Sequence, residues 1–145
     1  MHAKLSEWET GETVRLAGLC HAAYGTDGFA TGLLELDQRA LLVETIGADA
    51  EELVYRYASC DRRFSYPGLA EPDGLFRDRF TGKEFVPAEP TRRDLAAITV
   101  ANELDLVRVN PDFATEYGAG LLALFTRFRP LLEWPMWQDV TDLLA

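Results

Sequence analysis

The sequence predicts one all-α domain over residues 1–145, a helical bundle interrupted by a single short β-hairpin. Three observations lead to this fold class. Apolar residues recur at spacings of three and four in most segments, which is typical of amphipathic helices. Glycines, prolines and capping residues fall between these segments, and four of the seven prolines lie within residues 65–90. No internal repeat or low-complexity linker marks a second domain.

Four helices are predicted in the N-terminal half, over residues 1–9, 10–23, 36–46 and 48–63. Thr10 is expected to cap the second helix, because a threonine oxygen can accept a hydrogen bond from a free backbone N–H group. Gly25 and Gly28 then predict a loop. Gly47 is expected to end the third helix, because glycine adopts the left-handed conformation found just beyond many helices.

The C-terminal half predicts a hairpin over residues 76–86 and three further helices. The first covers residues 91–109, the second runs from residue 111 until Pro130 ends it, and a last short helix follows Trp137 and reaches Ala145. The hairpin is expected to turn at residues 81–82 and to place Arg79 opposite Glu84, a favourable cross-strand pair. Thr91, followed three residues later by an aspartate, matches a helix start signal. Asn110, followed by a proline and an aspartate, gives a second and stronger one.

Charge and cysteine content narrow the classes of partner. The formal net charge is −10, so phosphate backbones and anionic lipids are repelled, and we expect neither nucleic acid nor a membrane as partner. A small-molecule ligand and a homo-oligomer stay open. Cys20 and Cys60 fall among apolar residues and are predicted to be free, buried thiols. The longest apolar run, residues 119–125, is too short to cross a bilayer, and a cytoplasmic protein is expected.

Three polar residues interrupt the apolar stripes of three different predicted helices. They are His21, Asp61 and Asn102, each at helical spacing from apolar neighbours. A polar group on a buried stripe costs about 1–3 kcal/mol when it has no partner, so the three are expected to meet one another, water or a ligand. Tyr24 and Thr26 follow His21 on a loop, and Asp105 lies one turn beyond Asn102. Together with Asn102, these three are the candidate ligand-binding residues.

His21 and Asp61 are the candidate catalytic residues. A histidine titrates near neutral pH, which suits general acid–base chemistry. A carboxylate beside His21 would raise the pKa of the imidazole, while its own pKa falls. Simpler interpretations remain open for each residue. His21 is then a satisfied core residue, Asp61 pairs with the arginines that follow it, and Asn102 binds a loop backbone.

Residues 16–22 and 24–26, which read LAGLCHA and YGT, resemble a segment of a family of small bacterial proteins related to the HD superfamily. Residues 60–62 and 101–105 are similar to later segments of the same family. The resemblance implies an HD-like helical bundle. HD proteins hold one or two divalent metals with histidines and aspartates, and they hydrolyse phosphate esters or activate oxygen. HD proteins use an adjacent His-Asp pair among these ligands, and the resemblance implies that His21 occupies the position of the histidine in that pair.

The metal ligands of that family are incomplete in this chain. Ala22 stands where the aspartate of the pair is expected, and Asn102 replaces the distant aspartate. The upstream histidine has no counterpart, because His2 lies too close to His21. Too few hard ligands remain for a divalent ion, so neither a metal nor any other cofactor is predicted.

Three functions follow as hypotheses. The first is a small-molecule-binding domain, or a metal-independent acid–base enzyme, that reuses an HD-type pocket. The second is a non-catalytic accessory or protein-interaction module, which an exposed apolar patch within residues 113–128 would favour. The third is a divalent-metal-dependent phosphohydrolase or oxygenase of the HD superfamily. A closed cavity lined by His21, Asp61 and Asn102 would favour the first.

Overall fold

The computed structural model describes residues 1–29 and 31–145, and these confirm the all-α fold class with one short hairpin. The α-helices are α1 His2–Glu7, α2 Glu12–Leu19, α3 Arg39–Ile46, α4 Ala48–Ser59, α5 Arg62–Ser65, α6 Glu89–Val109, α7 Pro111–Phe128 and α8 Trp134–Leu144. The strands are β1 Phe76–Arg77 and β2 Glu84–Phe85. Within the described residues, no helix is both long and apolar enough to cross a membrane.

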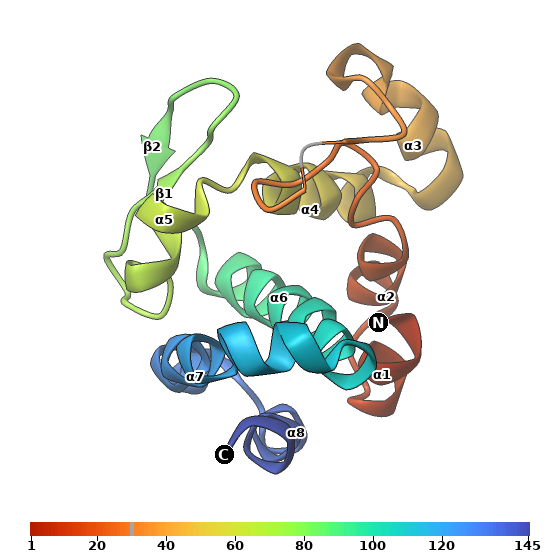
Figure 1. Ribbon diagram of the computed structural model, residues 1–145. Helices are drawn as coiled ribbons and strands as arrows, with labels where there is room; N and C mark the ends of the chain where they lie inside the picture. The colour runs from red at the N-terminus through yellow and green to blue at the C-terminus, as the bar shows by residue number, and fades with distance from the viewer. Residues whose placement is uncertain (30) are drawn as a thin grey trace.

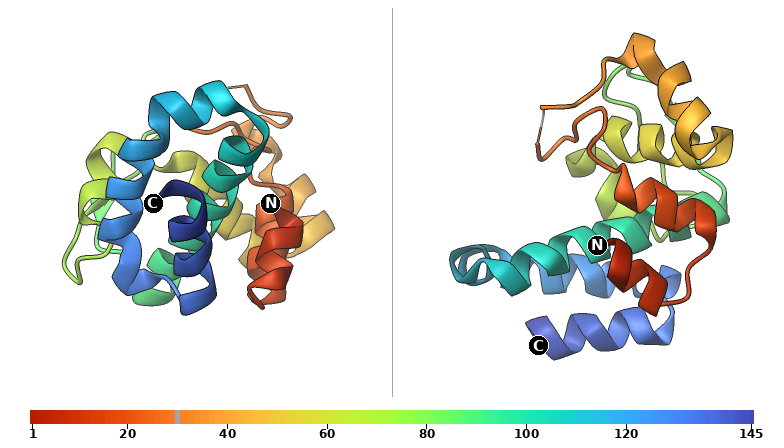
Figure 2. Two further views of the ribbon diagram at one scale, coloured as in Figure 1. Left: turned by 60° about the horizontal axis from the view of Figure 1, so that its bottom comes forward. Right: turned by 90° about the vertical axis from the view of Figure 1, so that its right-hand side faces the viewer.

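Helix α6 is the centre of the bundle (Figure 1). Its 21 residues make a helix about 30 Å long. Seven consecutive residues, 95–101, are buried, so this stretch is covered on all sides. The helices α1, α2, α4, α7 and α8 all pack against α6, whereas α3 packs on α4 and lies at the far end of the molecule from α8 (Figures 1 and 2).

The two ends of the chain meet on one side of α6. Leu5 of α1 is fully buried, and the indole Nε1 of Trp8 donates to Asp139 Oδ2 of α8 over 2.6 Å. Lys4 Nζ pairs with the same carboxylate at 3.2 Å. Figure 2 shows α1 and α8 side by side, so the first and last helices close the bundle together.

Several predicted helix ends are wrong, while others are confirmed. Thr10 does not cap α2: its hydroxyl donates to Leu5 O, and Gly11 is the N-cap. The helix stops at Leu19 instead of residue 23. Thr91 lies inside α6, which begins two residues earlier with a proline in its first turn. The predicted caps at Gly47, with φ of 89°, and at Asn110, whose Oδ1 accepts from the N–H group of residue 113, are both present.

The predicted helix over residues 48–63 is broken at Cys60. Cys60 is extended and forms a β-bridge with Asp78, and the hairpin backbone is hydrogen-bonded to residues 59–61. A long-range backbone contact therefore replaces the local helix. The thiols of Cys20 and Cys60 are free, as predicted, and burial raises the pKa of Cys60 to about 12.

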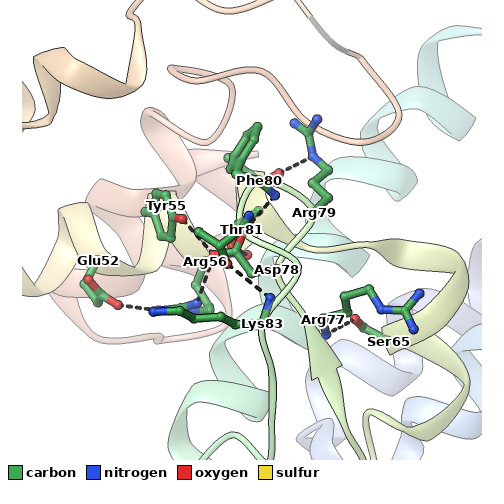
Figure 3. Close-up of polar contacts among 12 residues, drawn as sticks. Glu52, Tyr55, Arg56, Ser65, Arg77, Asp78, Arg79, Phe80, Thr81 and Lys83 are labelled. Atoms are coloured by element: carbon green, nitrogen blue, oxygen red, sulfur yellow. Dashed lines mark hydrogen bonds and ion pairs between the residues drawn. The ribbon is translucent and has the colours of Figure 1, made fainter.

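The hairpin has a different register from the predicted one. Arg77, not Arg79, lies opposite Glu84, with Nη2 and Oε1 3.5 Å apart. The turn is longer than expected because Asp78 organises it (Figure 3). Its buried carboxylate accepts from the N–H groups of Phe80 at 2.8 Å and residue 81 at 3.1 Å, and from the hydroxyl of Tyr55 at 2.7 Å. These contacts fix the turn to α4.

Candidate functional site

A tight turn at residues 26–29 covers the start of α5. Thr26 and Phe29 exchange two backbone hydrogen bonds, and the Thr26 hydroxyl accepts a third from Phe29 N at 3.0 Å. Asp27 Oδ2 accepts from Arg62 N at 2.9 Å. A side chain at Gly28 would lie 2.7 Å from Arg62 Nη1, so glycine permits the close approach of the turn to the guanidinium.

Arg62 is held between aromatic rings, and most of its donors are unused. Its Nη2 donates to Tyr57 Oη at 3.2 Å, and its guanidinium carbon lies 5.4 Å and 5.8 Å from the ring centroids of Tyr57 and Tyr66. The Nε atom is buried and has no hydrogen-bond partner among the described residues. An arginine carries five N–H donors, so this guanidinium has capacity for a further acceptor.

Glu103 faces Arg62 from α6. Its Oε1 lies 3.6 Å from Arg62 Nη1, which is an ion pair but longer than a hydrogen bond, and the two side chains are 13% and 19% exposed. Burial raises the pKa of Glu103, and the charge of Arg62 opposes that shift. Among the described residues, Arg62 is the one polar partner of the Glu103 carboxylate. A buried charge pair needs additional hydrogen bonds to offset its desolvation, and among the described residues this pair has the one from Arg62 to Tyr57 Oη.

This pair lies in a groove of about 500 Å³, which we call the α5–α7 groove. Its polar lining consists of Thr26, Arg62, Asn102 and Glu103. Its apolar lining consists of Phe29, Leu106, Phe113, Tyr117 and Leu121. Gly28 completes it. One depression is therefore surrounded by the turn, α5, α6 and α7. Its two charged side chains, Arg62 and Glu103, lie together, and the apolar side chains lie around them.

Two of the six predicted site residues, Thr26 and Asn102, meet in this groove. Asn102 reaches it because the predicted stripe is correct: Leu95 and Ile98 are buried on the same face of α6. The other four lie elsewhere.

Tyr24 is buried away from the groove. Its hydroxyl donates to Glu51 Oε1 at 2.8 Å, and Arg39 pairs with both oxygens of the same carboxylate, at 2.6 and 2.9 Å. Burial alone would raise the pKa of Glu51, but hydrogen bonds from Arg39 and Tyr24 outweigh it and lower that pKa. This network joins the loop after α2 to α3 and α4. Asp105 pairs with the N-terminal amino group and, at 3.5 Å, with Arg108.

His21 lies in the turn after α2 and not on a helix. Its Nδ1 is 2.9 Å from Gly18 O, and because a carbonyl oxygen only accepts, Nδ1 carries the proton. The ring meets that of Tyr57 edge-on, with centroids 5.8 Å apart. His21 lines a separate apolar depression of about 330 Å³ beside Leu33 and Leu42. His21 therefore contacts Tyr57, which also contacts Arg62, but it lies outside the groove.

The predicted pairing of His21 with Asp61 is wrong. Asp61 is not on a helical stripe: it caps α5, accepting from Phe64 N at 3.2 Å, and its other oxygen lies 3.6 Å from Arg77 Nη1. Burial lowers the pKa of His21, partly offset by the hydrogen bond with Gly18, whereas the predicted pairing required a raised value. The three stripe residues thus do not share a closed cavity.

The titration of His21 tests this assignment. We expect its NMR titration midpoint to lie below the ordinary value for histidine, because burial disfavours the imidazolium. Asp61→Asn should leave the midpoint unchanged, and His2→Asn removes the only other histidine signal. A raised midpoint that returns to the ordinary range in Asp61→Asn would restore the predicted pair.

Sequence reasoning missed Arg62, Glu103 and Tyr57. A usable signal existed for Glu103: it lies three residues after Val100 and four before Val107, both buried, so it interrupts a stripe as Asn102 does. No local signal marks Arg62, since charged residues beside a helix start are common. Its ring partners Tyr57 and Tyr66 lie close to it in the sequence, but Glu103 and the turn at 26–29 come from distant segments.

Comparison with protein families gives a match over the N-terminal part of the chain. Residues 1–62 match the model of a family described as "Domain of unknown function (DUF6817)". That segment includes the turn at 26–29 and Arg62, while Asn102, Glu103 and α7 lie outside it. No curated protein and no solved structure matches the chain. In the described residues, no three histidine, cysteine, aspartate or glutamate side chains gather as a metal site would require.

Proposed function

We propose that this protein binds a small, uncharged organic molecule in the α5–α7 groove. The observation that carries the proposal is the Arg62–Glu103 pair, which is mostly buried, 3.6 Å apart and short of hydrogen-bond partners. Leaving such groups unpaired costs about 1–3 kcal/mol each, and more for charged groups. A ligand that supplies the missing donor and acceptor would recover that free energy.

The size and lining of the groove support the same function. Small-molecule sites are clefts of about 300–1,000 Å³ with mainly apolar walls and a few convergent polar groups. At about 500 Å³, with five apolar residues beside Arg62, Asn102 and Glu103, the groove fits this description. A cavity of this size accepts a ligand of one or two rings.

Acid–base catalysis by His21 has less support than binding. Its ring lies outside the groove, and Asp61 is used as a helix cap. The relation to the HD superfamily stays a prediction that rests on the sequence resemblance. The interaction-module hypothesis expected a free apolar face within residues 113–128. Phe125 and Phe128 are fully buried, whereas Tyr117 is 48% exposed and lines the α5–α7 groove together with Phe113 and Leu121, so the open part of that face belongs to the groove.

A fragment screen tests the proposal. We expect uncharged aromatic fragments to shift the amide NMR signals of residues 26–29, 102–106 and 113–121. Tyr117→Ala should weaken their binding by about tenfold, because it removes an aromatic wall of the groove. The matched control is Trp134→Ala, since Trp134 is also an exposed helical aromatic, 66% exposed against 48% for Tyr117, but lies outside the groove.

Three results would contradict the proposal. The first is a set of shifts confined to the depression beside His21. The second is equal weakening by the two alanine variants, which would mean that binding follows general surface hydrophobicity. The third is a screen without any hit in the groove.

A further inference from the structure

We infer that the ligand presents an amide-type edge, an acceptor beside an N–H donor on a planar ring, to Arg62 and Glu103. The inference rests on the proposed function and names the class of molecule that the groove selects. Carboxamides of aromatic rings and cyclic amides have this edge.

The charges of the groove favour a neutral ligand. Among its lining residues only Arg62 and Glu103 are charged, and their formal charges cancel. A ligand carboxylate bound to Arg62 would also lie close to the carboxylate of Glu103. A ligand ammonium group bound to Glu103 would likewise lie close to the guanidinium of Arg62. Like charges brought together in a partly buried site are costly, so either ion is rejected.

The directions of the free hydrogen-bonding groups select an amide. Arg62 has only N–H donors to offer, and Glu103, when ionised, has only acceptors. An amide oxygen can accept from the guanidinium while the amide N–H group donates to the carboxylate. Asn102 carries one acceptor and two donors on the same wall, so it can bind either end of this edge.

The apolar wall fits a planar ring. The rings of Phe113 and Tyr117 lie one helical turn apart on α7, with centroids separated by 4.8 Å and planes inclined by 46°. Phe29 stands on the turn that also lines the groove. Aromatic side chains pack well against a flat ring in offset or edge-on contact.

Three probes of equal shape test the inference: benzamide, benzoate and benzamidine. Benzamide has both donor and acceptor, benzoate only acceptors and a negative charge, and benzamidine only donors and a positive charge. Titrations of the unmodified chain are followed by amide NMR shifts near neutral pH. We expect benzamide to bind in the groove with a Kd at least about tenfold lower than that of either ion.

The variant Glu103→Gln sharpens the test. It removes the negative charge and leaves Arg62, so benzoate should gain at least about tenfold relative to benzamide. Equal binding of the three probes, or preference for an ion by the unmodified chain, would overturn the inference while leaving the groove as the proposed site. Probe shifts located only outside residues 26–29, 62, 102–106 and 113–121 would overturn the inference and the proposed function together. If the variant does not fold, the comparison of the three probes on the unmodified chain is sufficient to test the inference.

Discussion

Asp78→Ala is expected to lower the free energy of unfolding by about 3 kcal/mol. The substitution leaves a buried tyrosine hydroxyl and two backbone N–H groups without their acceptor, and each unpaired group costs about 1 kcal/mol or more. Because Asp78 also forms the bridge to Cys60, the loss extends to the break between α4 and α5. Urea denaturation followed by circular dichroism measures the change.

Two controls separate this effect from a general loss of charge. Tyr55→Phe removes one of the three contacts and should cost about 1 kcal/mol. Asp73→Ala removes an exposed aspartate of a nearby turn and should stay within about 0.5 kcal/mol of the unmodified chain. An Asp78→Ala chain as stable as Asp73→Ala would show that the turn does not depend on this carboxylate.

Glu51→Gln is expected to lower the free energy of unfolding by about 2 kcal/mol at neutral pH. Removing one partner of a buried ion pair commonly costs about 3–5 kcal/mol, but the side chain of Arg39 is 33% exposed and recovers part of its hydration. The amide would also lose the double contact that both carboxylate oxygens make with Arg39.

The pH dependence identifies the cause. The pKa of Glu51 is lowered in the folded chain, so its charge stabilises the fold above the unfolded pKa of about 4.3. That stabilisation is lost as the pH falls through the folded pKa. The difference between the unmodified chain and Glu51→Gln should therefore be full at neutral pH and shrink below about pH 4. Glu44→Gln, on the exposed side of α3, is the matched control. A difference that persists undiminished in acid would assign the effect to packing.

The all-α class was predictable because it follows from spacing within single segments. The start of α7 at Asn110 and the end of α3 at Gly47 were predicted for the same reason, since each depends on a few adjacent residues. Some helix ends were wrong for local reasons, as at Thr10, whose hydroxyl bonds Leu5 O, but the larger errors occurred where a distant segment decides. Cys60 leaves the helix to pair with Asp78, and the hairpin register follows from the carboxylate inside its turn.

The residues of the candidate site also fall into two groups, those that a local sequence pattern predicts and those that it does not. Asn102 was found from its interrupted stripe, and Thr26 from its place after His21. Arg62 lies between Tyr57 and Tyr66, which are near it in the sequence, but it gains its role from Glu103 and the turn at 26–29, which are distant. A contact with distant segments leaves no pattern in the residues next to an arginine, so only the tertiary structure identifies it.

The contact between Trp8 and Asp139 has a consequence for synthesis. The two residues are 131 positions apart, so their hydrogen bond can form only after α8 has been synthesised, whereas α2 and α6, the other partners of α1, are made earlier. At about 5–20 residues per second, the indole of Trp8 waits roughly ten seconds for its acceptor. A nascent chain that ends before position 139 can dock α1 on α2 and α6 but lacks the contact that ties α1 to α8.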